Sequence, residues 1–191
     1  MEINQELKGI VSRSKTALLV WDVQNMLVDT IFNRDIFLSN THNLVTTARE
    51  KGVPVIFSKI TPLPEKFESP VRKFFWKKRA IKMPQVPNGY DLAINPLEND
   101  IVISKNTASI FIGTNFEMIL RNAGITTIVL TGIATEVGIE SSARDALNRG
   151  FFPVIITDAV SSFNQEAHKR SLENLANMMI LLETKELVSM W

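Results

Sequence analysis

Short apolar runs alternate with amphipathic segments along the chain. Six runs have the length of one buried strand each, at residues 16–21, 53–58, 100–104, 126–130, 152–157 and 178–182. Apolar residues at helical spacing occupy residues 36–51, 114–121, 136–149 and 165–177. Strands that alternate with helices indicate crossover connections, a mostly parallel sheet and helices on both of its faces. The pattern predicts an α/β fold, a three-layer α/β/α sandwich of Rossmann type around a six-stranded, mostly parallel sheet.

Local signals indicate where several of these elements begin and end. Gly52 is a typical residue just past a helix, and Thr114 with Glu117 has the spacing of a capping box that opens one. Gly132 interrupts the apolar run that begins at residue 126, so we expect the strand to end there. Residues 61–90 are predicted to form a long loop with one short helix.

Composition narrows the class of protein. The 191 residues favour a single domain, residues 1–191, and 45% hydrophobic with 21% charged residues is typical of a globular protein. Lys and Arg number 21 against 20 Asp and Glu, so no strong positive field attracts nucleic acid. The start of the sequence lacks the apolar core of a signal peptide, and no run is long enough to span a membrane. We therefore expect a cytoplasmic protein without membrane or nucleic-acid partners.

Cysteine is absent and histidine is scarce, which limits the chemistry. Without cysteine the chain has no disulfide, no thiolate metal site and no cysteine nucleophile. Only His42 and His168 occur, which excludes a histidine-rich metal site. We expect no metal and no cofactor.

Polar residues follow three of the predicted strands. Asp22 follows the first, Lys105 the third, and Thr135 with Glu136 begins the turn after the fourth. Each has an ordinary explanation, as a turn cap, a solvated strand end or a residue suited to a helix N-terminus. Together they are expected at one rim, because ligands bind outside the carboxyl ends of parallel strands. An Asp beside a Lys in a partly closed cleft has coupled protonation, which suits acid–base chemistry.

A set of motifs in fixed order resembles the isochorismatase-like hydrolases, also called the cysteine hydrolase superfamily. The matching segments are residues 17–25, 104–114, 120–125, 130–135, 140–146 and 157–160, with His168 in the last long helix. The resemblance implies the corresponding α/β/α fold, Asp22 as the catalytic aspartate and Lys105 as the catalytic lysine. It also places a cis peptide at Ile133–Ala134, with Ala134 and Thr135 beside the substrate. A homo-oligomer, dimer or tetramer, is expected, with residues 187–191 as one candidate contact.

One departure from the family pattern matters more than the matches. The family's amidases carry their cysteine nucleophile where this chain has Gly138. Covalent thioester chemistry is therefore not available to this chain. The Asp-x-His signature of the nicotinamidase metal site is also missing after Thr61.

True isochorismatases similarly place glycine at this position and hydrolyse a vinyl ether, releasing pyruvate. By that resemblance Asp22 is the acid that protonates the substrate, with its pKa raised by burial. We expect Lys105 to pair with a carboxylate of an anionic small-molecule substrate rather than with Asp22. The turn differs, however, because Ala134-Thr135-Glu136 stands where isochorismatases have Tyr-Ala-His. The alternative is a divergent or catalytically impaired amidase-type homologue that binds a small ligand or forms a structural oligomer, its nucleophile replaced by Gly138, naturally or by engineering.

The segment 72–79 interleaves cations and aromatic residues. As a lid, it would bring Arg72, Lys73 or Arg79 to the substrate's carboxylates and line the pocket with Phe75 or Trp76. An amphipathic helix with a solvated basic face is about as well supported, and a subunit contact is a third interpretation. Nucleic-acid binding is the least favoured interpretation, because the segment is short and the chain is nearly neutral.

Overall fold

The computed structural model describes residues 2–78 and 87–191, with the side chains of residues 2–4 and Trp76 outside that description. The strands are β1 (Thr16–Trp21), β2 (Val55–Ile60), β3 (Ile101–Lys105), β4 (Thr127–Ile133), β5 (Phe152–Ser161) and β6 (Ile180–Leu182). The helices are α1 (Glu2–Ile10), α2 (Asn25–Val28), α3 (Arg34–Glu50), α4 (Pro70–Lys78), α5 (Phe116–Asn122), α6 (Glu140–Asn148), α7 (Gln165–Ala176) and α8 (Thr184–Met190). Three single turns, η1 (Arg13–Lys15), η2 (Glu65–Phe67) and η3 (Thr135–Ile139), complete the described elements.

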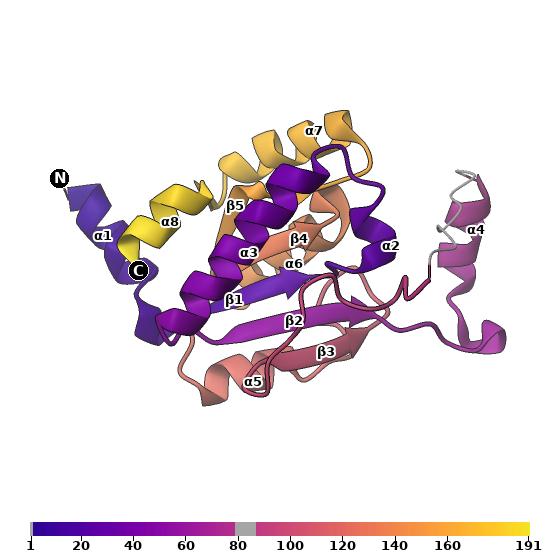
Figure 1. Ribbon diagram of the computed structural model, residues 1–191, viewed down its shortest axis with the longest axis horizontal. Helices are drawn as coiled ribbons and strands as arrows, with labels where there is room; N and C mark the ends of the chain where they lie inside the picture. Colours follow the sequence, from indigo (N-terminus) through magenta and orange to yellow (C-terminus); the bar gives the residue numbers. More distant parts are fainter. Residues whose placement is uncertain (1, 79–86) are drawn as a thin grey trace.

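The six strands form one sheet in the order β3-β2-β1-β4-β5-β6, and every adjacent pair is parallel. The predicted α/β sandwich is therefore confirmed. The chain builds β1, β2 and β3 in one direction and then returns to place β4 on the other side of β1. Strand order reverses between β1 and β4, and ligands of such sheets bind at the carboxyl ends beside this point. Figure 1 shows α2 and α4 at that end of the sheet, away from both termini.

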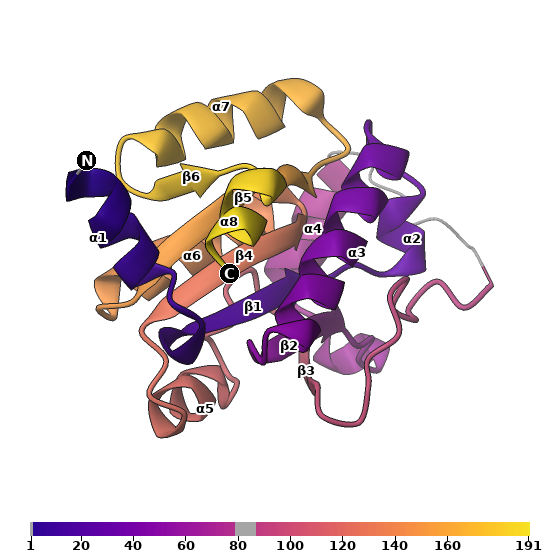
Figure 2. The same cartoon turned by 60° about the vertical axis from the view of Figure 1, so that its left-hand side comes forward.

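Side-chain alternation along β1 divides the core into two layers. Leu18 and Val20 belong to the cluster that α3 and α8 cover, whereas Leu19 and Trp21 belong to the cluster on the other face. That second cluster includes buried residues of α5, α6 and α7. Figures 1 and 2 show these helices on opposite sides of the sheet. Trp21 therefore points toward the layer that contains α6.

Two local predictions were wrong. Strand β4 does not end at Gly132 but continues to Ile133. Gly132 has φ of 134°, and a Cβ there would collide with the backbone of Trp21, so the glycine permits close pairing of β4 with β1. Thr114 does not form the predicted capping box, because the residue before α5 is Asn115 and makes no side-chain cap.

The segment 61–90 agrees with the prediction of a loop with one short helix, whereas two terminal helices were not predicted. Within the segment 61–90, the described residues 61–78 and 87–90 contain η2 and α4 and no other helix or strand. Helices α1 and α8 flank the sheet without having been predicted. None of the helices in the described part of the chain is long and apolar enough to cross a membrane.

The C-terminal residue is part of this protein's own core. Trp191 is 8% exposed, and its indole N–H donates to the carbonyl of Val11 at 2.9 Å. Figure 2 shows the end of α8 beside the N-terminal part of the chain. The side chain therefore joins two segments that lie 180 residues apart.

We expect Trp191→Ala to lower the free energy of unfolding by about 3 kcal/mol, because a large buried side chain is lost and a carbonyl loses its donor. Lys185→Ala on the same helix is the control, since the Lys185 side chain is 80% exposed. Urea denaturation followed by circular dichroism measures both variants. Equal midpoints for the two variants would contradict the structural role of Trp191.

Candidate active site

Asp22 leaves the carboxyl end of β1 in an unusual backbone conformation. Its φ is 47°, in the left-handed region that costs a non-glycine residue about 1–2 kcal/mol. Its backbone N–H lies 3.2 Å from both the carbonyl and the hydroxyl oxygen of Ser58 on β2. Because the chain bends here, Asp22 and its predecessor Trp21 line the same cavity instead of pointing to opposite faces of the sheet.

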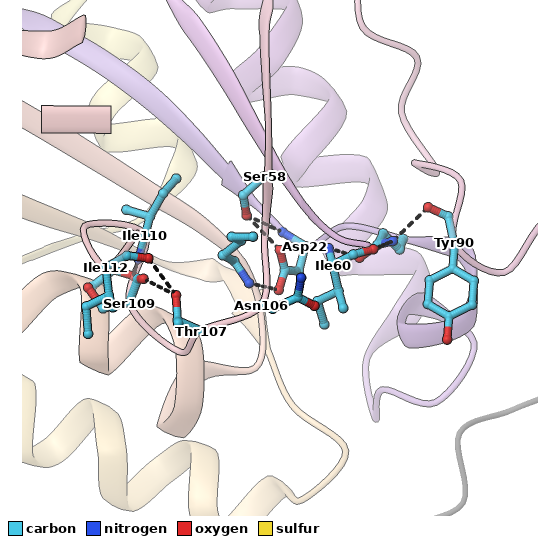
Figure 3. A network of polar contacts seen from close by, with 12 residues as sticks. Asp22, Ser58, Ile60, Tyr90, Asn106, Thr107, Ser109, Ile110 and Ile112 are labelled. Carbon is cyan, nitrogen blue, oxygen red and sulfur yellow. Dashed lines mark hydrogen bonds and ion pairs between the residues drawn. The ribbon is translucent and has the colours of Figure 1, made fainter. Parts of the chain in front are cut away.

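The Asp22 carboxylate is held by two buried donors. Ser58 Oγ donates to Oδ1 at 2.7 Å, and Lys105 Nζ donates to Oδ2 at 2.5 Å. Figure 3 shows Ser58 directly over the Asp22 carboxylate. The Lys105 and Asp22 side chains are only 2% and 4% exposed. The ends of β1, β2 and β3 thus each supply one member of the group.

Burial changes the proton affinities of both charged groups. Burial raises the pKa of Asp22, although Lys105 and Ser58 oppose the rise by stabilising the carboxylate. Burial also lowers the pKa of Lys105, against the attraction of Asp22. The two shifts bring the proton affinities of Asp22 and Lys105 closer together, which favours exchange of a proton within the pair.

The sequence predicts that Lys105 stands apart from Asp22, and the structure differs. We expected Lys105 to be reserved for a substrate carboxylate. Instead it contacts Asp22, because a desolvated ammonium next to a desolvated carboxylate costs less than either charge alone.

Trp21 completes the surroundings of the lysine. The Lys105 Nζ lies 3.8 Å from the centroid of the indole ring, within the range of a cation–π interaction. The same indole packs directly against the backbone of Gly138 in η3. The lysine is therefore enclosed by a carboxylate on one side and an aromatic face on another.

A cavity of about 300 Å³ opens above these groups. Its polar lining comes from Asp22, Lys105, Arg72, Asn106 and Thr107. The remaining wall is apolar and consists of Trp21, Leu27, Ile60, Phe75, Ala108, Ile133, Ala134, Val137, Gly138 and Phe163. A cavity of this size and lining suits a small molecule with an apolar part and an anionic part.

The five further residues of the predicted site do not all lie at the cavity. Ala134 and Phe75 line the cavity, and the Ile133–Ala134 peptide is cis as expected. Thr135 does not line it: its hydroxyl donates to Ser161 O at 3.1 Å and lies 2.8 Å from His168 Nδ1. Trp76 is on α4, but its side chain is outside the description, and Arg79 lies outside the described residues.

His168 contacts the turn η3 through the hydroxyl of Thr135. The single hydroxyl proton of Thr135 is donated to Ser161, so the Thr135 oxygen accepts from Nδ1–H of a neutral His168. Burial lowers the pKa of His168, which favours that neutral form. Glu136 turns away from the cavity, and its Oε1 accepts from Ser162 Oγ at 2.7 Å.

Three contributors were not identified as site residues from the sequence alone. Trp21 ends an apolar run and resembles a core residue, whereas Ser58 is a polar residue at the end of the second predicted run, a signal that could have found it. Asn106 lies in the matching segment 104–114, and its buried Oδ1 has no hydrogen-bond partner in the described part of the chain. Arg72, which was considered as a lid residue, lines the cavity, donates to Asn106 O at 3.1 Å and pairs with Glu68.

The described residues include no group of three His, Cys, Asp or Glu side chains placed to hold a metal ion. The polar groups that line the cavity are the Asp22–Lys105 pair, Arg72, Asn106 and Thr107.

Comparison with known proteins identifies relatives along most of the chain. The isochorismatase family protein YecD of Escherichia coli O157:H7 is 31% identical over 163 residues, which cover 84% of this chain and 87% of that protein. Ureidoacrylate amidohydrolase RutB of Pseudomonas syringae pv. syringae (strain B728a) is 30% identical over 188 residues, covering 84% of this chain and 77% of that protein.

A solved structure shows the same fold. A cysteine hydrolase from Pseudomonas syringae pv. phaseolicola 1448A superposes with a TM-score of 0.84 over 95% of this chain and 94% of its own, at 18% identity. The model of the isochorismatase domain matches residues 16–186, from the first residue of β1 into α8. This chain therefore belongs to the isochorismatase family of hydrolases.

Proposed function

We propose that this protein hydrolyses an enol ether of pyruvate, the isochorismate type of substrate, with water rather than a side chain as the attacking group. One observation carries the proposal. The buried pair of Asp22 and Lys105 faces a cavity of small-molecule size, and the neighbouring turn offers Gly138, with no atom that can attack a carbonyl. An acid-catalysed reaction needs no such atom.

The chemistry requires one well-placed proton. Asp22 in its protonated form donates the proton to the methylene carbon of the enol ether, which creates an oxocarbenium ion. Water adds to that cation, and the hemiketal collapses to pyruvate and the free alcohol, returning a proton to the site. The raised pKa of Asp22 supports this role, because a carboxyl group of ordinary pKa is almost entirely ionised near neutral pH.

Substrate binding favours the protonated form of Asp22. A carboxylate that approaches Lys105 gives the ammonium another anion to pair with, and the stabilisation of the Asp22 carboxylate weakens. Arg72 adds a second positive charge to the same cavity. Asn106 Oδ1 is an acceptor without a protein partner in the described chain, and it suits the role of orienting the attacking water.

A second candidate is hydrolysis of a small amide or ureido acid by water. The relative RutB supports it, since that protein is a ureidoacrylate amidohydrolase. In this reaction the ionised Asp22 acts as a base on water. The same pair would then work in the opposite protonation state, so the pH dependence separates the two candidates.

Incubation with isochorismate is expected to release pyruvate, and Asp22→Asn is expected to reduce kcat/KM by about 10²- to 10⁴-fold, the usual contribution of a general acid. Pyruvate formation is measured by a coupled enzymatic assay. Asp91→Asn is the matched control, because Asp91 is exposed and does not line the cavity. Circular dichroism verifies that the variants are folded.

Turnover by Asp22→Asn at the rate of Asp91→Asn would contradict the role of Asp22. If ammonia is released from a ureido acid and no pyruvate from the ether, the second candidate replaces the first. If neither substrate reacts, both catalytic proposals fail, and binding of a small anion without turnover is the function that remains.

The activity on the enol ether is expected to fall as pH rises, because the reaction needs Asp22 protonated. Since burial raises the pKa of this carboxyl, the midpoint of the fall in kcat/KM is expected above about pH 4, the value for an ordinary carboxyl. A pH series from 4 to 9 measures it. An activity that instead rises with pH through this range would favour a base at Asp22 and hence the amide reaction.

A further inference from the structure

Trp21 and Gly138 compete for one volume. The Trp21 side chain is 1% exposed, and a Cβ added to Gly138 would overlap the Nε1, Cε2 and Cζ2 atoms of its indole. Overlap of this kind is with a rigid, buried ring rather than with the end of a flexible side chain. A residue larger than glycine at position 138 therefore requires the indole to move.

The backbone of Gly138 does not itself require glycine. Its φ is outside the left-handed region that disfavours side chains, unlike that of Gly132. Gly138 lies in η3, a π-helical turn whose other residues, such as Val137 and Ile139, carry side chains. Space, and not conformation, is the reason for glycine at this position.

The indole also lies at the reactive end of the cavity. Trp21 lines the cavity with Asp22 and Lys105, and the ammonium is 3.8 Å from the ring centroid. A side chain that grew from position 138 into the volume of the indole would therefore lie beside the Lys105 ammonium. That is the position from which a nucleophile would face a bound substrate.

We propose that Trp21 is the specificity-determining residue of this site, because its indole occupies the volume that a nucleophile at position 138 would need. The proposal rests on the proposed function in one respect, that the cavity is the reaction site. It explains why the attacking group is water, because the large residue at position 21 fills the space that the small residue at position 138 leaves. Replacing Trp21 with a smaller residue should open space for a reactive side chain at position 138.

The test uses the absence of cysteine from this chain, which makes any introduced thiol the only one. The variants are Gly138→Cys, Trp21→Val with Gly138→Cys, and Trp21→Val alone. Gly9→Cys is the matched control, because Gly9 lies in an exposed helix and a Cβ there meets no atom within 4 Å. Thermal unfolding and the rate of alkylation by iodoacetamide are measured for each, without any substrate.

Alkylation joins the thiolate sulfur to the carbon of iodoacetamide and releases iodide, so its rate reports the thiolate fraction. We expect Gly138→Cys to lower the Tm by roughly 5 °C or more through overpacking, while Gly9→Cys stays near the parent protein. The double variant should recover stability relative to Gly138→Cys. Its thiol should reach half-maximal reactivity below pH 8.5, the value for a free thiol, because the Lys105 ammonium stabilises the thiolate.

The proposal is overturned if Gly138→Cys is as stable as the parent, or if its thiol has the reactivity of that in the double variant. It is also overturned if the double variant's thiol titrates like that of Gly9→Cys. Should the double variant fail to fold, the cycle of Trp21→Leu with Gly138→Ala replaces it, and strictly additive Tm changes there overturn the proposal. None of these readouts depends on pyruvate release, so failure of the proposed function is recognised separately.

Discussion

A desolvated ion pair is the constraint on which the site depends. Asp22 and Lys105 come from β1 and β3, which are separated in the sheet by β2, and their charged atoms meet at 2.5 Å. Neither charge is stable alone in this environment, so each fixes the position of the other. The strand order, the left-handed turn at Asp22 and the hydroxyl of Ser58 all serve this contact. Both residues of the pair line the cavity.

Much of the fold could be predicted because the sheet is buried on both faces. Strands such as β1 and β4 are continuous apolar runs, and the polar residue that follows each run indicates the carboxyl end of a strand. Parallel pairing then brings Asp22 and Lys105 to one rim. Their direct contact could not be predicted, since it depends on the length and direction of the lysine side chain across β2.

Other features escaped prediction because they depend on three-dimensional proximity. Gly132 resembles a strand breaker in the sequence, yet it is the residue that lets β4 approach the backbone of Trp21. Trp21 itself resembles any large core residue at the end of a strand. Its relation to Gly138 spans more than a hundred positions and leaves no local pattern. Sequence reasoning therefore identified the missing nucleophile but not what stands in its place.

The shared volume of Trp21 and Gly138 has an evolutionary consequence. The two positions cannot vary independently, so their order of change matters. A smaller residue at 21 first leaves a cavity, which a folded protein of ordinary stability tolerates. A larger residue at 138 first forces atoms into occupied space. A lineage that passes from water-based to side-chain-based chemistry would thus lose its aromatic residue before it acquires a nucleophile.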